Sequence, residues 1–278
     1  KIKYKVINYF GYLGNRHVIN QLSANDYQKV FHNIKIAINN LFFDYPRLAI
    51  IETGNTCNIN CATCPTPRRY LGRPLGLMNL DNFKKIIDNI KDHVHVVLLY
   101  NTNEPLLNPH LGEMIKYASK QHLYTMVSTN ATLLDEKKTD ELLTVGLDEI
   151  LLCLDGTTKE SYEPFRVGAD FDTVLKNIKH FCIEKQRKHL NKPYVEIQFI
   201  VTKLNQDQIP EMKKLAKELK TDRLRIKSLA VVEYAYTEQE RKELMEKFFP
   251  TRDDVKVRYE KNKTGAVNKR IVKECNTV

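Results

Sequence analysis

Short apolar segments alternate with amphipathic stretches along most of the chain. Six segments have the length and the nearly continuous apolar character of buried strands. They are Leu48–Glu52, His95–Tyr100, Leu123–Ser128, Glu149–Leu154, Tyr194–Val201 and Arg223–Ser228. Between them apolar residues recur at helical spacing, as at Phe83, Ile86, Ile87 and Ile90. The pattern therefore predicts strands that alternate with helices.

Repeated strand–helix units predict an α/β fold with a parallel sheet and right-handed crossovers. Eight such units close a full barrel, whereas six predict a partial (β/α)6, TIM-like barrel. In barrels of this kind the chemistry lies at the carboxyl ends of the strands. The loops that follow the six strands are therefore the places where functional residues are expected.

The alternation also suggests three regions. Residues 1–47 form an N-terminal helical extension with a helix from Asp26 to Phe43, residues 48–230 form the barrel, and residues 231–278 form a C-terminal extension. The last region contains a predicted helix over Thr237–Phe249, which Pro250 ends. Two local signals mark helix starts: a capping box at Thr157 and Glu160, and an N-cap at Asn205.

Composition narrows the class of protein. With 278 residues, 42% hydrophobic and 28% charged, the chain is long and apolar enough to bury a sizeable core. No apolar run approaches the roughly 18 residues that span a bilayer, so no membrane partner is expected. The net charge of +10 permits an acidic partner such as nucleic acid, but solvated lysine-rich helices give the same sum. A nucleic-acid partner is therefore not favoured.

The cysteines are the strongest chemical signal. Six cysteines in 278 residues are too sparse for a disulfide framework, which predicts a reducing, cytoplasmic compartment. Three of them, Cys57, Cys61 and Cys64, form a C-x3-C-x2-C motif directly after the first predicted strand. An iron–sulfur cube usually takes four cysteines. With three, one iron keeps an open coordination site, and an open site is where a metal does chemistry.

Three alternatives exist for this motif: a zinc site, a redox pair at Cys61 and Cys64, or three buried thiols. Zinc prefers a fourth ligand and paired knuckles, and no second knuckle is present. Redox C-x-x-C pairs normally open a helix, whereas Pro65 and Pro67 follow Cys64 at once. The cluster interpretation is therefore favoured.

The motif in this position resembles the radical S-adenosylmethionine (SAM) superfamily. The resemblance implies a [4Fe–4S] cluster held by Cys57, Cys61 and Cys64, with SAM bound to the fourth iron. One electron from the cluster would cleave SAM to methionine and a 5′-deoxyadenosyl radical, which would abstract hydrogen from a substrate. The chemistry would belong to the cofactor, and the barrel would orient the reactants and exclude water.

Segments after the second and third strands carry the resemblance further. Asn103-Glu104-Pro105 is similar to the Gly-Glu-Pro segment that binds the SAM amino group, with Asn103 in place of glycine. Asparagine tolerates left-handed backbone angles, so the contact is expected to survive. Ser128-Thr129-Asn130-Ala131 resembles the family's Ser/Thr-Asn-Gly segment, with Ala131 in place of glycine, and Ser128 and Asn130 are carried over as SAM-binding residues.

After the fourth strand, the run from Leu154 to Leu175 resembles the branch that carries a C-terminal SPASM or twitch extension. In that branch an arginine placed like Arg166 can bind the SAM carboxylate. Asp155 is the catalytic candidate, as a possible substrate ligand at a strand end, although it could equally be a charge at a helix start. Gln198 and Lys227 could project inward from the last two strands.

The other cysteines play smaller parts in the prediction. Cys153 and Cys182 are expected to be packed core thiols. Cys275 falls where the first SPASM cysteine would stand. Either the natural chain continues, or Cys275 is isolated and the enzyme has one cluster, so no auxiliary cluster is predicted.

The sequence thus predicts a radical SAM enzyme whose substrate is a peptide or a small molecule. Maturation of a peptide or protein side chain is favoured, with a dehydrogenase or epimerase acting on a sugar or aminocyclitol as the alternative. Its electron donor would be a protein such as flavodoxin or ferredoxin. A zinc-stabilised nucleic-acid-binding module is the alternative from another class.

Overall fold

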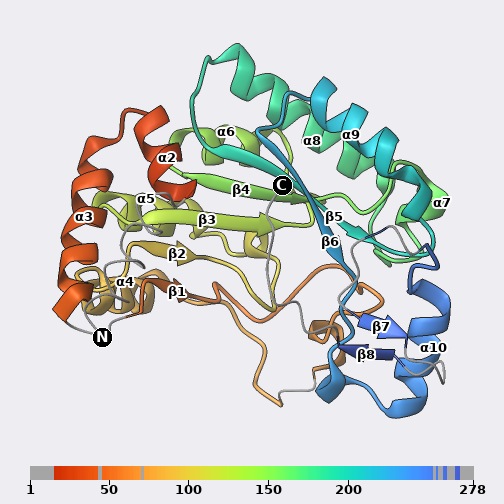
Figure 1. Cartoon of the computed structure of the whole chain (residues 1–278). Coiled ribbons are helices and arrows are strands. Elements are labelled where there is room, and N and C mark those ends of the chain that lie inside the picture. Colours follow the sequence, from red (N-terminus) through yellow and green to blue (C-terminus); the bar gives the residue numbers. More distant parts are fainter. Residues whose placement is uncertain are drawn as a thin grey trace.

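A single six-stranded parallel sheet organises the molecule. The computed structural model describes residues 16–42, 46–69, 72–252, 255, 259–261 and 267–269. The strands are β1 (Leu48–Ile50), β2 (Val96–Leu98), β3 (Tyr124–Thr129), β4 (Glu149–Cys153), β5 (Tyr194–Val201) and β6 (Arg223–Ser228), paired in chain order (Figure 1). Because β1 and β6 do not pair with each other, the sheet curves without closing. This confirms the predicted partial barrel.

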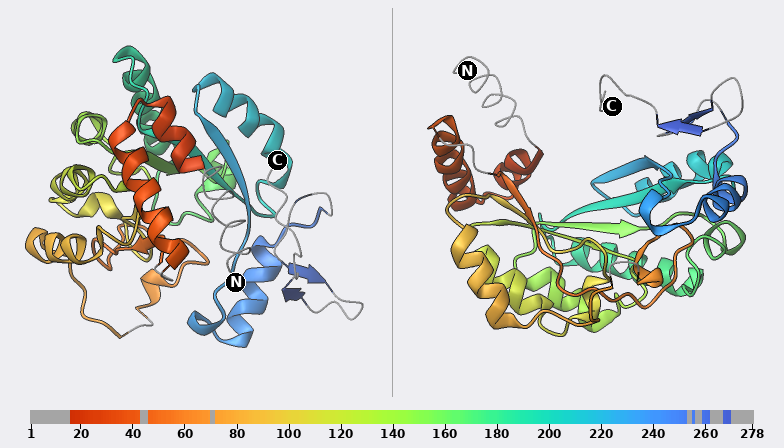
Figure 2. Two further views of the ribbon diagram at one scale, coloured as in Figure 1. Left: turned by 60° about the vertical axis from the view of Figure 1, so that its left-hand side comes forward. Right: turned by 90° about the horizontal axis from the view of Figure 1, so that it is seen from below.

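The crossover helices cover one side of this sheet and leave the other open (Figure 2). They are α4 (Leu80–Ile90), α5 (Leu111–Lys120), α6 (Glu136–Thr144), α7 (Lys159–Tyr162), α8 (Phe171–Arg187) and α9 (Ile209–Glu218). Their apolar stripes bury residues such as Phe83, Met114 and Ile178 against outward-facing strand residues such as Val127 and Phe199. This burial is the main stabilising contribution to the barrel.

The inner side of the sheet is different in character. Its small apolar cluster consists of Val96, Tyr124, Met126 and Leu151. Along β5 and β6 the register pairs Glu196 with Arg223 and Gln198 with Arg225, so polar side chains alternate with apolar ones there. The inner face therefore carries charges that the outer face excludes.

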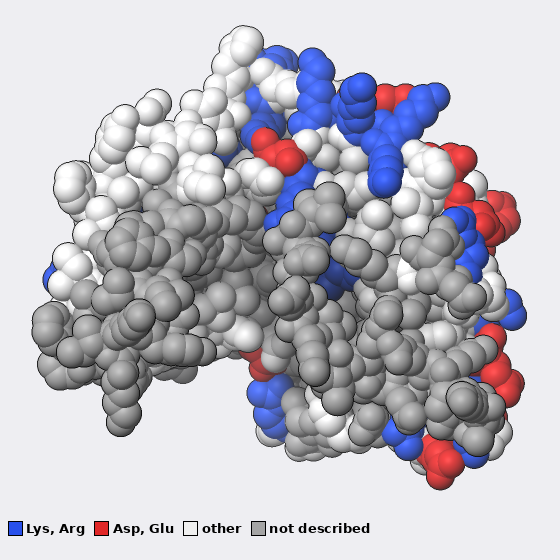
Figure 3. Space-filling view, viewed as in Figure 1, with Lys and Arg blue, Asp and Glu red and all other residues white. Residues whose placement is uncertain are grey.

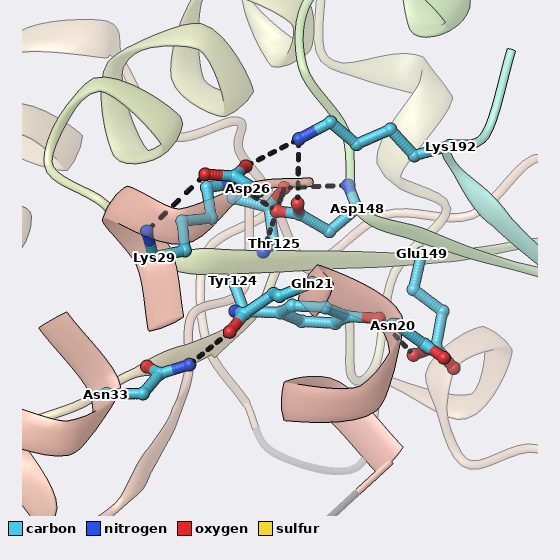
Figure 4. Close-up of polar contacts among 10 residues, drawn as sticks. All are labelled: Asn20, Gln21, Asp26, Lys29, Asn33, Tyr124, Thr125, Asp148, Glu149 and Lys192. Carbon is cyan, nitrogen blue, oxygen red and sulfur yellow. Dashed lines mark hydrogen bonds and ion pairs between the residues drawn. The ribbon is translucent and has the colours of Figure 1, made fainter. Parts of the chain in front are cut away.

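Two helices of the N-terminal extension lie at the amino ends of the strands. They are α2 (Arg16–Ser23) and α3 (Tyr27–Phe42), which confirms the predicted helix with its ends moved by one residue (Figures 1 and 4). The Asn20 amide donates to the Tyr124 hydroxyl at 3.0 Å, and that hydroxyl donates to Glu149 at 3.0 Å. Lys29 Nζ lies 2.5 Å from Asp148 Oδ2, and both side chains are buried. These contacts fasten the extension to the start of β3 and β4.

The chain after β6 packs near the opposite ends of the strands. It contains the short 3₁₀ helix η4 (Glu233–Ala235), the predicted α10 (Glu238–Phe248) and an antiparallel pair, β7 (Tyr259–Lys261) and β8 (Val267–Lys269). Sequence analysis did not predict that pair. The division into three regions remains a prediction, although Phe248 and Phe249 share an apolar cluster with Phe165 of the barrel.

One local prediction was wrong, and a second was right in position only. The capping box before α7 uses Thr158 and Ser161, one residue later than Thr157 and Glu160. Asn205 precedes the 3₁₀ helix η3 (Gln206–Gln208) but makes no side-chain cap. Its amide instead donates to the carbonyl oxygens of Asp155 and Ile200, both at 2.8 Å, because it is fully buried among them. Among the described residues, no helix has the length and apolar character required to cross a bilayer.

Candidate functional site

The three cysteines of the C-x3-C-x2-C motif line one cavity at the carboxyl ends of the strands. The cavity has a volume of about 290 Å³, close to the lower end of the range for ligand pockets. Residues on or just after β2, β3, β4 and β5 complete its wall, among them Tyr100, Ser128, Cys153 and Gln198. The position agrees with the expectation that chemistry lies at this end of the barrel.

Backbone hydrogen bonds hold the cysteine loop in place although it has little regular structure. The amide of Asn60 donates to the carbonyl of Val167 at 2.7 Å, and that of Ala62 donates to Phe165 at 2.9 Å. The Tyr236 hydroxyl, from the chain after β6, donates to the carbonyls of Ala62 at 3.2 Å and Cys64 at 3.0 Å. Sequence analysis missed Tyr236, and no motif near it could have indicated this contact.

Each motif sulfur has a different polar neighbour. The amide of Asn130 donates to Cys57 Sγ at 3.8 Å, Arg166 Nη1 donates to Cys61 Sγ at 3.4 Å, and Cys64 Sγ donates to Thr66 Oγ1 at 3.4 Å. Burial raises the pKa of the Cys57 thiol to about 11 and also raises that of Cys61. Metal binding at these thiols would release their protons.

Asp155 and Arg166 form a buried ion pair beside Cys61. The Asp155 carboxylate is fully buried, accepts from Arg166 Nε at 2.6 Å and also accepts from the Ile200 amide at 2.5 Å. Arg166 therefore reaches from Asp155 to the cysteine loop. Because these protein partners engage the carboxylate, the geometry favours a positioning role for Asp155, and its predicted catalytic role stays a prediction.

The Glu104 carboxylate is occupied by the end of β3. It accepts from Thr129 Oγ1 and from the backbone amide of Asn130, both at 2.8 Å, and from the backbone amide of Leu106 at 3.1 Å. Burial raises its pKa, although these hydrogen bonds oppose the shift. Glu104 thus joins the loop after β2 to the loop after β3, and its predicted contact with SAM stays a prediction.

The two positions at which glycine is replaced differ in conformation. Asn103 is not among the described residues with positive φ, so the left-handed tolerance expected of it is not used. Its amide donates to Thr53 Oγ1 at 2.9 Å instead. Ala131, by contrast, has φ +60° and is fully buried. The backbone there keeps a conformation that glycine adopts more easily.

Ser128, near the end of β3, and Asn130, just after it, both line the cavity, and their predicted contacts with SAM stay predictions. The side-chain amide of Asn130 donates to Asn58 Oδ1 at 3.0 Å, and the side-chain amide of Asn58 donates to Thr132 Oγ1 at 2.7 Å. The end of β3 is thus tied to the cysteine loop. Asn58 stands inside the motif itself, and this position was the one available signal for its role.

Cys153 and Cys182 are both buried, as predicted, but they lie in different surroundings. Cys182 belongs to the apolar cluster under α8. Cys153 lines the cavity, where its sulfur lies 3.5 Å from Ser128 Oγ and 3.7 Å from Gln198 Nε2. The apolar run predicted that Cys153 is buried, but it did not indicate that the inner face at this strand end borders the cavity. Cys275 lies outside the described residues.

The donor set fits a cluster with one open iron. Three thiols from one loop meet in one cavity, and polar groups on Asn130 and Arg166 stand ready to donate to the sulfurs, an arrangement that tunes iron–sulfur sites. Among the described residues, no three His, Cys, Asp or Glu side chains are grouped to hold a single metal ion. In a cube each thiolate binds its own iron, so the three thiols need not converge on one ion.

Comparison with known proteins identifies the family. The sequence profile described as Radical SAM superfamily matches residues 51–216, so the chain belongs to this superfamily. Its cofactors are a [4Fe–4S] cluster and SAM. This membership favours the cluster over the zinc-stabilised nucleic-acid-binding alternative.

Two curated relatives and one solved structure illustrate the similarity. The AdoMet-dependent heme synthase of Methanosarcina barkeri is 30% identical over 175 residues, which cover 63% of this chain and 48% of the relative. The PqqA peptide cyclase of Bradyrhizobium diazoefficiens is 24% identical over 184 residues, 66% of this chain and 47% of the relative. The chain spans about half the length of the curated relatives it matches.

The crystal structure of Streptococcus suis SuiB bound to precursor peptide SuiA has a TM-score of 0.57 at 18% identity. The match covers 79% of this chain and 50% of that one. At this identity the similarity shows the fold, and the fold is the open barrel described above.

Proposed function

We propose that this chain is the catalytic barrel of a radical SAM enzyme that modifies a side chain of a peptide or protein. Cys57, Cys61 and Cys64 would hold the cluster. Arg166, Asn103, Glu104, Ser128 and Asn130, which line the same cavity, would bind SAM. When bound, the cluster would supply the electron for cleavage of SAM, and the 5′-deoxyadenosyl radical would serve to remove a hydrogen atom from the substrate.

The observation that carries this proposal is the convergence of the three thiols on one cavity, with Arg166 beside them. Arg166 presents a guanidinium that suits a carboxylate, and Asp155 holds that guanidinium in orientation. The strand ends that line the cavity would orient the reactants around the cluster.

A peptide substrate is favoured by the relatives. PqqA peptide cyclase and SuiB with its precursor peptide are named for peptides, and both share this domain or its fold. An electron donor such as flavodoxin or ferredoxin would reduce the cluster. We infer a cytoplasmic setting because the five described cysteines are free thiols, which a reducing compartment maintains.

The test is anaerobic reconstitution followed by assay for SAM cleavage. We expect about four iron atoms per chain and release of 5′-deoxyadenosine after addition of dithionite. Protein that takes up no iron, or that takes up iron but releases no 5′-deoxyadenosine, would contradict the proposal. Candidate peptides and, separately, sugars are then added to show which class increases the rate of 5′-deoxyadenosine release. An increase with sugars and not with peptides would favour the small-molecule alternative.

A further inference from the structure

The inner face of β6 carries a row of cations. Arg223, Arg225 and Lys227 alternate along this strand. In Figure 3, blue Lys and Arg side chains follow the course that β6 takes in Figure 1. Glu196 on β5 is fully buried and pairs with Arg225 at 2.6 Å and with Arg223 at 3.7 Å. One buried carboxylate thus serves both arginines.

Lys227 has no such partner. Its ammonium donates to Gln198 Oε1 at 3.0 Å, a neutral acceptor. No carboxylate of the described chain lies within ion-pair distance of it, while the arginines of the same strand are paired. Desolvation lowers the pKa of Lys227, and the more distant Asp155 and Glu196 carboxylates only partly oppose this shift.

Lys227 stands close to the cavity of the three cysteines. Gln198, its hydrogen-bond partner, lines that cavity, and so does Ile200, its register partner on β5. Arg166, the cation on the cavity wall, is already paired with Asp155. Arg166 is also the group proposed above for the SAM carboxylate, so among the described residues Lys227 is the nearby cation that is left for a substrate carboxylate. An ammonium has three donors, and one of them is used by Gln198.

We propose that Lys227 and Gln198 form a subsite for a substrate carboxylate, so that the peptide substrate presents an aspartate or glutamate side chain to the cavity. This proposal rests on the proposed function and specifies its substrate class. A carboxylate in this position can accept from Lys227 Nζ and from the Gln198 amide, which now points toward Cys153. A charge-assisted hydrogen bond of this kind discriminates a carboxylate from the amide of the same shape.

The experiment compares two capped peptides that differ only in this group, acetyl-Trp-Ala-Glu-Ala-amide and acetyl-Trp-Ala-Gln-Ala-amide. The chain contains no tryptophan, so tryptophan anisotropy reports the peptide alone. The full chain is titrated both as isolated and after anaerobic reconstitution. We expect the glutamate peptide to bind about tenfold more tightly than the glutamine peptide.

Variants locate the effect. Lys227→Met should reduce the preference to less than about twofold, and Lys227→Arg should retain most of it. Lys213→Met on the outer face of α9 is the matched control, because Lys213 is exposed, and this variant should behave like the parent. Because Lys227 is itself exposed in the open sheet, its replacement is not expected to unfold the protein.

Three results would overturn the subsite: equal binding of the two peptides, no saturable binding of either, or an unchanged preference in Lys227→Met. These results are separable from failure of the proposed function. Release of 5′-deoxyadenosine without peptide tests the cluster and SAM alone, whereas peptide binding to the isolated protein requires neither. A protein that cleaves SAM but ignores the carboxylate would retain the proposed function and lose the subsite.

Discussion

The two ends of the sheet both contain a buried aspartate paired with a cation, yet they differ in what surrounds the pair. At the amino end Asp148 receives Lys29 at 2.5 Å, Lys192 at 3.4 Å and the Thr125 amide at 2.9 Å (Figure 4). At the carboxyl end Asp155 receives Arg166, whose guanidinium also reaches Cys61. The first pair is enclosed by α2, α3 and the strands, and the second borders a cavity.

This difference separates stability from function within one fold. Every partner of Asp148 named here belongs to the framework, so the amino end fastens the helical extension to the sheet. At the carboxyl end, Arg166 pairs with Asp155 and still donates a hydrogen bond to the Cys61 sulfur. Barrels commonly divide the roles of their two faces in this way. Changes at the two ends should therefore affect different measurements.

The largest effect is expected from Cys61→Ala. Loss of one of three thiolates should prevent stable cluster assembly and abolish SAM cleavage, because no other described cysteine of the loop can replace it. Iron content and 5′-deoxyadenosine release measure this. Cys182→Ala is the control, since Cys182 lies in the apolar core, and it should keep its iron. Equal iron content in both variants would contradict the assignment.

The amino end should respond in stability and not in chemistry. Lys29→Met leaves Asp148 buried with weaker compensation from Lys192, so the free energy of unfolding should fall by about 3 kcal/mol. Urea denaturation measures this. Lys35→Met removes a solvent-exposed pair with Asp92 and should cost less than about 1 kcal/mol. If Lys29→Met instead reduced SAM cleavage per iron without loss of stability, the comparison between the two ends would fail.

Acid should weaken the amino end through His95, which is buried just before β2. Burial, with His17, Arg47 and His32 nearby, lowers its pKa to about 3. The pKa of His95 in the folded protein lies below its value of about 6.5 in the unfolded chain. The contribution of neutral His95 to stability is therefore fully present above about pH 6.5 and is lost as the pH falls toward 3. The unfolding free energy of the apoprotein should drop by about 2 kcal/mol between pH 7 and pH 5. His95→Gln should flatten this dependence, and an unchanged slope would exclude His95 as its source.

A smaller effect is expected at the carboxyl end from Arg166→Lys. The charge remains but the fork that can hold a carboxylate in two places is lost, so SAM affinity should fall about tenfold. Equilibrium dialysis of labelled SAM into reconstituted protein measures this, with iron content as the control. Asp155→Asn should weaken SAM binding in the same direction, because it releases Arg166. Unchanged affinity in both variants would show that this pair does not position SAM.

The sequence predicted the framework well because apolar periodicity is a local property. β5 and β6 have their predicted bounds, and the cysteine motif marks its own loop. The amino-end pair was not predictable, since Lys29 and Asp148 are 119 positions apart and neither stands in a motif. Tyr236, which braces the cysteine loop from 172 positions beyond Cys64, is a similar case.

Side-chain roles at strand ends were harder to predict than the strands themselves. Cys153 continues an apolar run, and only the curvature of the sheet reveals that its side chain faces the cavity. Asp155 was recognised from its position, but its partners come from three separate segments and could not be deduced from local pattern. For Gln198 and Lys227 the sequence left open whether the side chains project inward, and their contact became evident from the structure of β5 and β6.

The most direct measurement is the electron paramagnetic resonance spectrum of the reconstituted, dithionite-reduced protein before and after addition of SAM. An iron without a protein ligand should bind SAM, so the signal of the reduced cluster should change shape on addition. S-adenosylhomocysteine, which lacks the sulfonium methyl group, serves as the comparison for cleavage. A reduced cluster whose spectrum is unaffected by SAM at saturating concentration would mean that all its irons are already ligated, contrary to this account.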